Sequence, residues 1–284
     1  MSEHITAKML PIMRFFIRIG KAVLYFKNRA IELIKFIGGI VILFGELIHW
    51  IIMAIVKPGV KFRQSALIGQ MVRVGVKSIG IITLVQVFIG IILVLQMSPT
   101  LADYGQLDKV ANVIGVAVFR ELGPLITAVV LSGFAGASIA AELGAMVEAE
   151  EVKALKAHAL NPINFLVVPR VLATVFMMIC LTVISDVVGV IGGFMTSVFI
   201  LGIDAQLYLQ NTQASLMMKD FITGLVKAGV FGLLISLIAC FLGLRVTGGA
   251  EGVGRATTQT VVFSIVALIA TDCLFTAFFY TMGW

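Results

Sequence analysis

The sequence predicts an all-α integral membrane protein with an N-terminal interfacial amphipathic helix, about five transmembrane helices and a short cytoplasmic helix between two of them. Hydrophobic residues make up 60% of the 284 residues and charged residues only 13%, about half the share found in soluble domains. The apolar runs exceed the length of about 18 residues that a membrane helix requires. They lack strand-like alternation, so we expect helices rather than barrel strands.

The basic residues predict the orientation in the membrane. The net charge is +6, but the basic residues crowd the first 77 positions and the loops of one side, which indicates membrane orientation rather than nucleic-acid binding. The predicted cytoplasmic side holds Lys153, Lys156, Arg170, Arg245 and Arg255, and the predicted external side holds only Lys109 and Lys219. We therefore expect a cytoplasmic N-terminus and an external C-terminus.

Residues 1–56 are predicted to form helices at the membrane surface, ahead of a membrane domain at residues 57–284. Residues 12–29 have the pattern of a basic amphipathic helix, with basic side chains on one side and apolar ones on another. The basic residues, at i, i+4 and i+7, are Arg14, Arg18 and Lys21. The alternative is a surface helix of a soluble domain, but no soluble domain follows it.

The apolar run 36–56 is long enough to cross the membrane, but its charges argue against a simple crossing. Glu46 and His49 interrupt it, and basic residues flank it on both sides, which suggests that both ends are cytoplasmic. The flanking residues are Lys35, Lys57, Lys61 and Arg63. We interpret the run as interfacial or re-entrant; a full span, the alternative, would place the N-terminus outside.

Five further apolar segments predict the transmembrane helices. They are 66–97, 112–147, 165–200, 221–243 and 257–282. As one helix the second segment would be roughly 54 Å long, against a hydrocarbon core of about 30 Å. It must tilt, protrude or break. We expect a break at Gly123-Pro124, because Pro124 has no N–H to donate to the carbonyl of Arg120.

Among the charged residues inside the predicted spans, we single out four as candidates for a site. They are Arg120, Glu121, Lys227 and Asp272. Neighbouring residues of a helix point about 100° apart, so Arg120 and Glu121 are not a simple pair. Arg120 either faces protein or a cavity, or extends to the external headgroups. Lys227 is expected to meet Asp272 or Glu121, and sequence alone leaves open whether this pairing is structural or forms a substrate site.

Small residues recur every four positions in the second span. One row consists of Gly136, Ala140 and Gly144, and a second row consists of Gly133, Ala137, Ala141 and Ala145. Such rows let two helices approach closely. The approach could be within one chain or across a dimer, and both interpretations stay open.

The charged segment Glu148–His158 separates the second and third spans and is predicted to be a helix that docks a soluble partner. An isolated short helix buries little by itself and gains order from a partner. Val152 and Leu155 are the expected apolar anchors, with Glu151 and Lys153 fixing the orientation. The alternative is a solvated loop helix.

No catalytic or metal-binding motif emerges from the sequence. The glycine-rich stretch at 248–258 lacks the G-x-x-x-x-G-K-[ST] pattern of a phosphate loop and is expected to form a cytoplasmic turn. The three histidines lie in different segments, and no zinc motif or serine elbow is present. The sequence therefore predicts a protein that is not an enzyme and has no cofactor or metal of its own.

Several motifs together resemble the MlaE/YrbE family of permeases, from about Lys57 to the C-terminus. They are RELGP at 120–124, AAELG at 140–144, E-x-x-x-L at 151–155, the NP and PR pairs at 161–162 and 169–170, and GVGRATT at 252–258. The sequence departs from the family at Phe134, where the family usually has arginine. The resemblance makes residues 57–284 a permease domain.

The resemblance implies the membrane subunit of an ABC transporter in the inner membrane. It implies a homodimer of permeases, two ATPase subunits on the cytoplasmic side and an MCE-domain protein on the periplasmic side. The cargo would be lipid, most often phospholipid, as in pathways that maintain outer-membrane lipid asymmetry. ATP would be bound by the partner subunit, Glu148–His158 would be the coupling helix, and the C-terminus would be periplasmic.

We predict a lipid site between two permease copies, in the external half of the membrane. Its residues would be Arg120, Glu121, Pro124, Leu125, Val87, Ile91 and Lys227. Arg120 could present its multi-donor charge to a phosphate. One alternative is an ion-coupled secondary transporter that uses the intramembrane charges as a relay; another is a lipid-modifying membrane enzyme. Co-purification of a P-loop ATPase would favour the ABC transporter over both.

Overall fold

The computed structural model describes residues 2–56 and 64–283, which contain helices and turns and no strand. The chain forms two units, Met1–Glu46 and Leu47–Trp284. Six helical segments within the described residues are long and apolar enough to cross a membrane by length and composition. The predicted all-α membrane fold is therefore confirmed.

The first helix, α1, runs unbroken from Ser2 to Val56. The prediction of two separate N-terminal helices is wrong, because residues 29–36, between them, contain no proline or glycine and favour helix. A re-entrant turn within 36–56 is also wrong, since the helix does not turn back. Ile31–Ala54 meets the length and hydropathy of a span, and an interfacial helix is equally compatible with a continuous α1.

Several residues used to interpret the N-terminal region lie outside the description of the structure. The flanking Lys57, Lys61 and Arg63 fall outside the described residues, as do the side chains of Arg14, Arg18 and Lys21. The amphipathic pattern at 12–29 and the boundary at 56/57 therefore stay predictions.

The other five candidate spans overlap the five predicted from sequence, and each begins a few residues earlier than predicted. They are Gln64–Asp103, Leu107–Glu148, Ile163–Phe199, Met218–Gly243 and Gly249–Thr281. Their elements in chain order are α2 (Gln64–Val74), η1 (Val76–Ser78), α3 (Ile79–Asp103), η2 (Leu107–Lys109), α4 (Val110–Ala117), η3 (Val118–Leu122), α5 (Gly123–Leu131), η4 (Ser132–Gly136), α6 (Ala137–Glu148), α7 (Glu151–Ala157), η5 (Ile163–Val167), α8 (Val168–Phe199), α9 (Ala205–Ser215), α10 (Met218–Gly243) and α11 (Gly249–Thr281).

The second span stays helical past Gly123-Pro124, so the predicted break is wrong. A π-helical segment, η3, precedes the proline, and the N–H of Gly123 donates to the carbonyl of Val118, five residues back. Pro124 then occupies the first turn of α5, where a missing N–H is tolerated. The wider turn accommodates the proline ring without unwinding the backbone beside Arg120.

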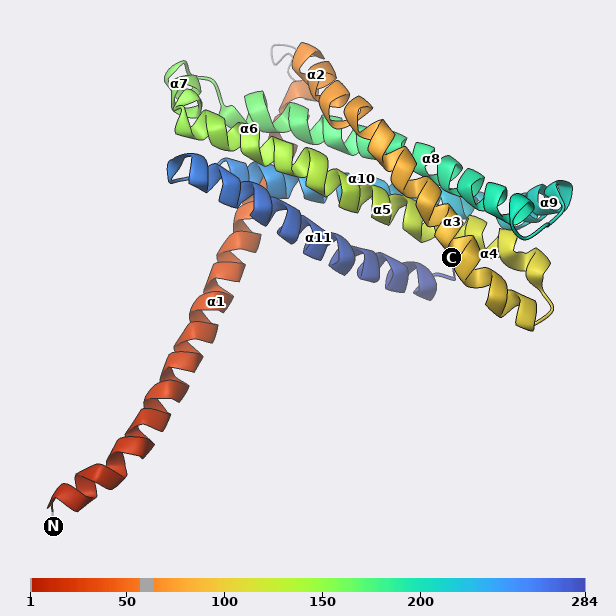
Figure 1. Cartoon of the computed structure of the whole chain (residues 1–284). Coiled ribbons are helices and arrows are strands. Elements are labelled where there is room, and N and C mark those ends of the chain that lie inside the picture. The colour runs from red at the N-terminus through yellow and green to blue at the C-terminus, as the bar shows by residue number, and fades with distance from the viewer. Residues whose placement is uncertain (1, 57–63, 284) are drawn as a thin grey trace. The chain divides into compact units, whose positions relative to one another are not determined.

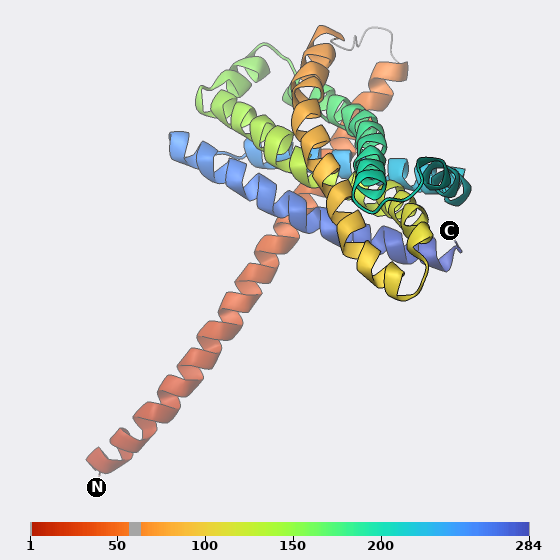
Figure 2. The same cartoon turned by 45° about the vertical axis from the view of Figure 1, so that its right-hand side comes forward.

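The helices of the unit from Leu47 onward pack around α8 and α10. Helix α3 packs along α8, α10 packs on α8 and α6, and α11 packs on α6 and α10 (Figures 1 and 2). One end of this bundle carries α7 and the start of α11, and the other carries α9 and the start of α4. The loops predicted for one side of the membrane therefore lie at one end of the bundle, and those predicted for the other side lie at the opposite end.

Close helix contacts depend on small residues in this bundle. Gly136 packs against Ile235 of α10 and Thr260 of α11, and Gly144 packs against Val246. Ala140 is fully buried. The first small-residue row therefore serves packing within one chain. Gly133 belongs to the other row, and a Cβ placed there would meet nothing within 4 Å.

Large apolar side chains remain exposed along the outer helices. Those of α3 and α11 include Leu84, Phe88, Ile92, Val262, Val266 and Ile269. In water such continuous apolar surface would favour aggregation, whereas in a bilayer it is the surface that contacts lipid chains. Some charged residues of the spans, by contrast, are buried inside the bundle; they are Arg170, Asp186, Asp220, Lys227 and Asp272.

Candidate functional site

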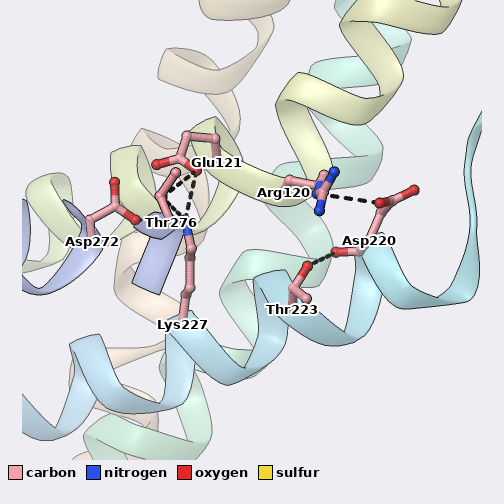
Figure 3. Close-up of polar contacts among 7 residues, drawn as sticks. All are labelled: Arg120, Glu121, Asp220, Thr223, Lys227, Asp272 and Thr276. Carbon is pink, nitrogen blue, oxygen red and sulfur yellow. Dashed lines mark hydrogen bonds and ion pairs between the residues drawn. The ribbon is translucent and has the colours of Figure 1, made fainter. Parts of the chain in front are cut away.

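A cavity of about 270 Å³ opens where η3, α10 and α11 meet. Its lining residues come from these three elements. They are Arg120, Glu121, Thr223, Lys227, Thr276, Phe279 and Tyr280. Three residues that the sequence predicted for the lipid site, Arg120, Glu121 and Lys227, are therefore brought together, and Figure 3 shows their contacts.

Lys227 is the centre of one charge cluster. Its Nζ lies 2.6 Å from Glu121 Oε2 and 3.0 Å from the hydroxyl oxygen of Thr276, and it donates a hydrogen bond to each. Asp272 Oδ1 is 2.8 Å away as an ion pair without hydrogen-bond geometry. Both partners that the sequence left open for Lys227 thus bind it at once.

Arg120 belongs to a second pair. Its Nε lies 3.3 Å from Oδ1 of Asp220, whose side chain is only 4% exposed. Asp220 Oδ2 also accepts a hydrogen bond from the N–H of Met217, at the start of α10. One carboxylate therefore caps α10 and orients the guanidinium. As predicted, Arg120 and Glu121 do not pair with each other (Figure 3).

Two opposite charges of these clusters reach the solvent-accessible surface of the cavity. The side chain of Arg120 is 31% exposed and that of Glu121 is 35% exposed. Lys227 and Asp272 are largely buried. A molecule in the cavity would therefore meet one guanidinium and one carboxylate, backed by buried charges that hold them in place.

Four residues predicted for the lipid site do not line the cavity. The backbone of Val87 lies against Gly192 in the contact between α3 and α8, and Pro124 is buried. Leu125 and Ile91 are partly buried, and neither is among the lining residues. The physical reason is that α3 packs on α8, whereas the cavity is walled by α10 and α11.

Sequence reasoning missed five residues of the site. They are Asp220, Thr223, Thr276, Phe279 and Tyr280. Asp220 lies just before the predicted span 221–243, in the loop that the sequence predicts to be external, although an acidic residue in the first turn of a helix is a recognisable cap. The threonines and aromatics carry no such signal, because their role follows only from the packing of α11 beside η3.

The predicted docking helix is shorter than expected. Glu148 ends α6, and Glu150 adopts a left-handed conformation with φ of 59° that separates it from α7. Glu151 and Lys153 are exposed on α7, and Lys153 lies 2.6 Å from Glu150. This contact lowers the pKa of Glu150 and raises the pKa of Lys153.

The two expected anchors, Val152 and Leu155, are half-buried within this chain. They are the least exposed residues of α7, because they lie on the side of the helix that faces its own bundle. The more exposed face of α7 carries Glu151, Lys153, Ala154, Lys156 and Ala157. A partner that docks on α7 therefore meets charged and small side chains together with the edges of the two apolar ones.

A third charge cluster joins α2, α6 and α8 near α7. Glu142 pairs with Arg73 through one oxygen and lies 3.2 Å from Arg170 through the other. Arg170 also donates to the carbonyl of Leu166 at 2.9 Å. The cluster brings together the AAELG and PR motifs, which are separate in sequence.

Comparison with known proteins places this architecture in a family. The model of the family described as Permease MlaE matches residues 67–278. The chain belongs to the MlaE permease family. The site residues on η3, α10 and α11, except Phe279 and Tyr280, fall inside the match, so the cavity is part of the family's domain.

Comparison with individual proteins extends this similarity. The chain is 32% identical over 273 residues to the "Intermembrane phospholipid transport system permease protein MlaE" of Haemophilus influenzae, covering 96% of this chain and all of the relative. It is 38% identical over 229 residues to a "Probable ABC transporter permease protein" of Rickettsia bellii, covering 81% and 88%. It is 32% identical to "Protein TRIGALACTOSYLDIACYLGLYCEROL 1, chloroplastic" of Arabidopsis thaliana, covering 81% and 65%. The chain is a multi-pass permease subunit of an ABC transporter.

Proposed function

We propose that this permease moves phospholipid between the inner membrane and a periplasmic MCE-protein pathway, with ATP hydrolysed by separate subunits. The observation that leads to this proposal is the cavity in which Arg120 and Glu121 present opposite charges. The name of the Haemophilus influenzae relative supports the class of cargo.

The cavity chemistry matches a phospholipid headgroup. A guanidinium offers planar, multiple donors to a phosphate, and the neighbouring carboxylate suits an ammonium group, so a zwitterionic headgroup satisfies both Arg120 and Glu121. A volume of about 270 Å³ is at the small end of ligand pockets, enough for a headgroup rather than a whole lipid. The acyl chains would extend past Phe279 and Tyr280 along the apolar outer surface.

We place two copies of the permease side by side, two ATPase subunits beneath α7 and an MCE-domain protein at the end that carries α9. The cavity is large enough for a headgroup but not for the acyl chains of a lipid. A second copy of the permease would supply the apolar wall that these chains need. The small-residue row that begins at Gly133 is exposed at Gly133 and Ala145 and half-buried between them, and it offers a surface for close helix contact. In this arrangement the N-terminus is cytoplasmic and the C-terminus periplasmic, in the inner membrane.

The test is co-purified lipid measured by native mass spectrometry beside a melting curve. Arg120→Ala should weaken the binding of phosphate-headgroup lipid roughly ten-fold or more, since a charge-assisted hydrogen bond contributes about 1.5–3 kcal/mol. Arg120→Lys should recover part of the binding, because the charge survives but the planar donor group does not. Lys109→Ala removes an exposed external cation and should change nothing.

The rival role for Arg120 is purely structural, as the partner of Asp220. It predicts that Arg120→Ala keeps its lipid and loses thermal stability, and that adding Asp220→Asn restores the stability. That outcome would refute the lipid site.

A second candidate function is an ion-coupled secondary transporter. The observation that favours it is the buried cluster of Lys227, Glu121 and Asp272, because ionisable residues inside a membrane often mark ion pathways. Co-purification distinguishes the two: an ABC permease retains a P-loop ATPase from the native membrane, and a secondary transporter does not.

A further inference from the structure

A buried carboxyl group lies against Gly123, the residue whose N–H closes the π turn η3. Asp186, midway along α8, is 1% exposed, and neither of its carboxyl oxygens has a hydrogen-bond partner among the described residues. Its Oδ1 packs so closely on Gly123 that a Cβ there would overlap it. Gly123 directly follows η3, the turn that carries Arg120 and Glu121.

Two further buried polar side chains, on α3 and α5, belong to the helices that pack on α8 near Asp186. The amide of Gln86 packs against Gly189, one helical turn after Asp186, and Thr127 follows Gly123 by one turn of α5. Gln86 and Thr127 are each 1% exposed. In the part of the chain that the structure describes, their side-chain polar atoms have no partner either.

The cations of the neighbouring elements are engaged elsewhere. Arg120 of η3 pairs with Asp220, and Lys227 of α10 binds Glu121 and Asp272. Arg170, the other charged residue of α8, pairs with Glu142 near α7. Helix α3 contains no lysine or arginine, and Lys219 lies half-buried at the start of α10, four residues after Ser215, the last residue of α9. Among the described residues, no side-chain cation is recorded as a partner of Asp186.

An ionised carboxylate buried without a counter-charge is one of the most costly arrangements in a protein, and more so inside a membrane. We propose that Asp186, with Gln86 and Thr127, forms a site that binds one positive charge. The charge is either a proton on the carboxyl group or an alkali-metal ion held by the carboxylate, amide and hydroxyl oxygens, which are the ligands that hard cations prefer.

The site and the cavity share one piece of backbone. The Gly123 N–H closes the π turn on the Val118 carbonyl, Val118 itself contacts Gly189, and Asp186 packs on Gly123 from behind. When the site holds its proton or ion, it therefore supports the backbone geometry of η3, the turn from which Arg120 and Glu121 reach the cavity. The inference rests on these contacts and does not depend on the identity of the cargo.

The experiment compares the wild-type chain with Asp186→Asn, which keeps the shape and removes the charge. Infrared difference spectra of the two proteins in nanodiscs detect a protonated carboxyl group through its C=O stretch. Melting curves in sodium, potassium and choline chloride detect an alkali-metal ion. A proton gives a carboxylic-acid band that Asp186→Asn lacks, with the same melting temperature in all three salts.

An alkali-metal ion gives no such band but raises the wild-type melting temperature over choline by roughly 4 °C or more, and Asp186→Asn loses this rise. If the wild type shows neither the band nor a salt-dependent shift, the proposal is wrong.

Two further variants test the site if Asp186→Asn does not fold. Gln86→Leu and Thr127→Val remove the neighbouring oxygens. Either variant should therefore shift the carboxylic-acid band, or weaken the binding of the alkali-metal ion about ten-fold, as judged from the salt concentration that raises the melting temperature. Thr196→Val is the matched control, because that buried threonine of α8 donates its hydroxyl to the carbonyl of Gly192. Readings unchanged by both Gln86→Leu and Thr127→Val would overturn the proposed site.

Discussion

At the scale of single residues, charge inside this bundle is shared rather than paired one to one. Lys227 meets two carboxylates and a hydroxyl, Glu142 meets two arginines, and Asp220 binds Arg120 while capping a helix. Each of these three residues thereby connects more than one element. Such arrangements are strongly destabilised when one member is removed, because the others stay buried without a partner.

We predict that Lys227→Met lowers the stability of the permease by about 2–4 kcal/mol, because Glu121 and Asp272 would then face each other without a cation. The lower end applies to the extent that Glu121 can be hydrated, since its side chain is 35% exposed. Thermal melting in detergent measures the loss. The triple variant with Glu121→Gln and Asp272→Asn should regain much of it, and a Lys227→Met protein that melts like wild type would contradict the prediction.

At the scale of elements, π turns precede two of the prolines inside the spans. Segment η3 ends two residues before Pro124, and η5 ends two residues before Pro169. A proline within a helix lacks one N–H and crowds the preceding carbonyls, and a π turn relieves this by widening the helix just before it. Such turns are frequent at functional sites, and here η3 carries two cavity residues.

Helix α7 is the element through which we expect the ATPase to act. Leu155→Asp should release the ATPase while the permease still inserts, because a charge at an apolar anchor disrupts docking. Pull-down of the ATPase with the purified permease measures this. Ala157→Asp introduces the same charge on the exposed face. Release by Ala157→Asp alone would show that the exposed face docks and that Leu155 serves its own chain.

At the scale of the whole molecule, the loops divide between two membrane sides. Single cysteines at Gln106 and Gln210 should react with an impermeant reagent from outside, and one at Lys156 only from inside. All three positions are exposed. Cys273 is also exposed and is replaced by serine first. External labelling at Lys156 would invert the topology.

The sequence alone determined the class, the five main spans and the charges that the cavity uses, because hydropathy over about 20 residues and the cost of buried charge are local properties. It also indicated that Arg120 and Glu121 do not pair with each other and that Lys227 meets an acidic partner. The family motifs followed from the same residues.

Only the tertiary structure decided which groups meet. Asp220 and Thr276 join the site from helices that lie about 100 and 155 positions beyond η3 in the chain, and no local pattern encodes such contacts. The structure also replaced the expected break at Gly123-Pro124 by a π turn, because the helix gains more from continuing its hydrogen bonds in the membrane than from unwinding. The structure also excluded Val87 from the cavity, because α3 packs on α8. That packing is a property of the assembled bundle and cannot be seen in the sequence around Val87.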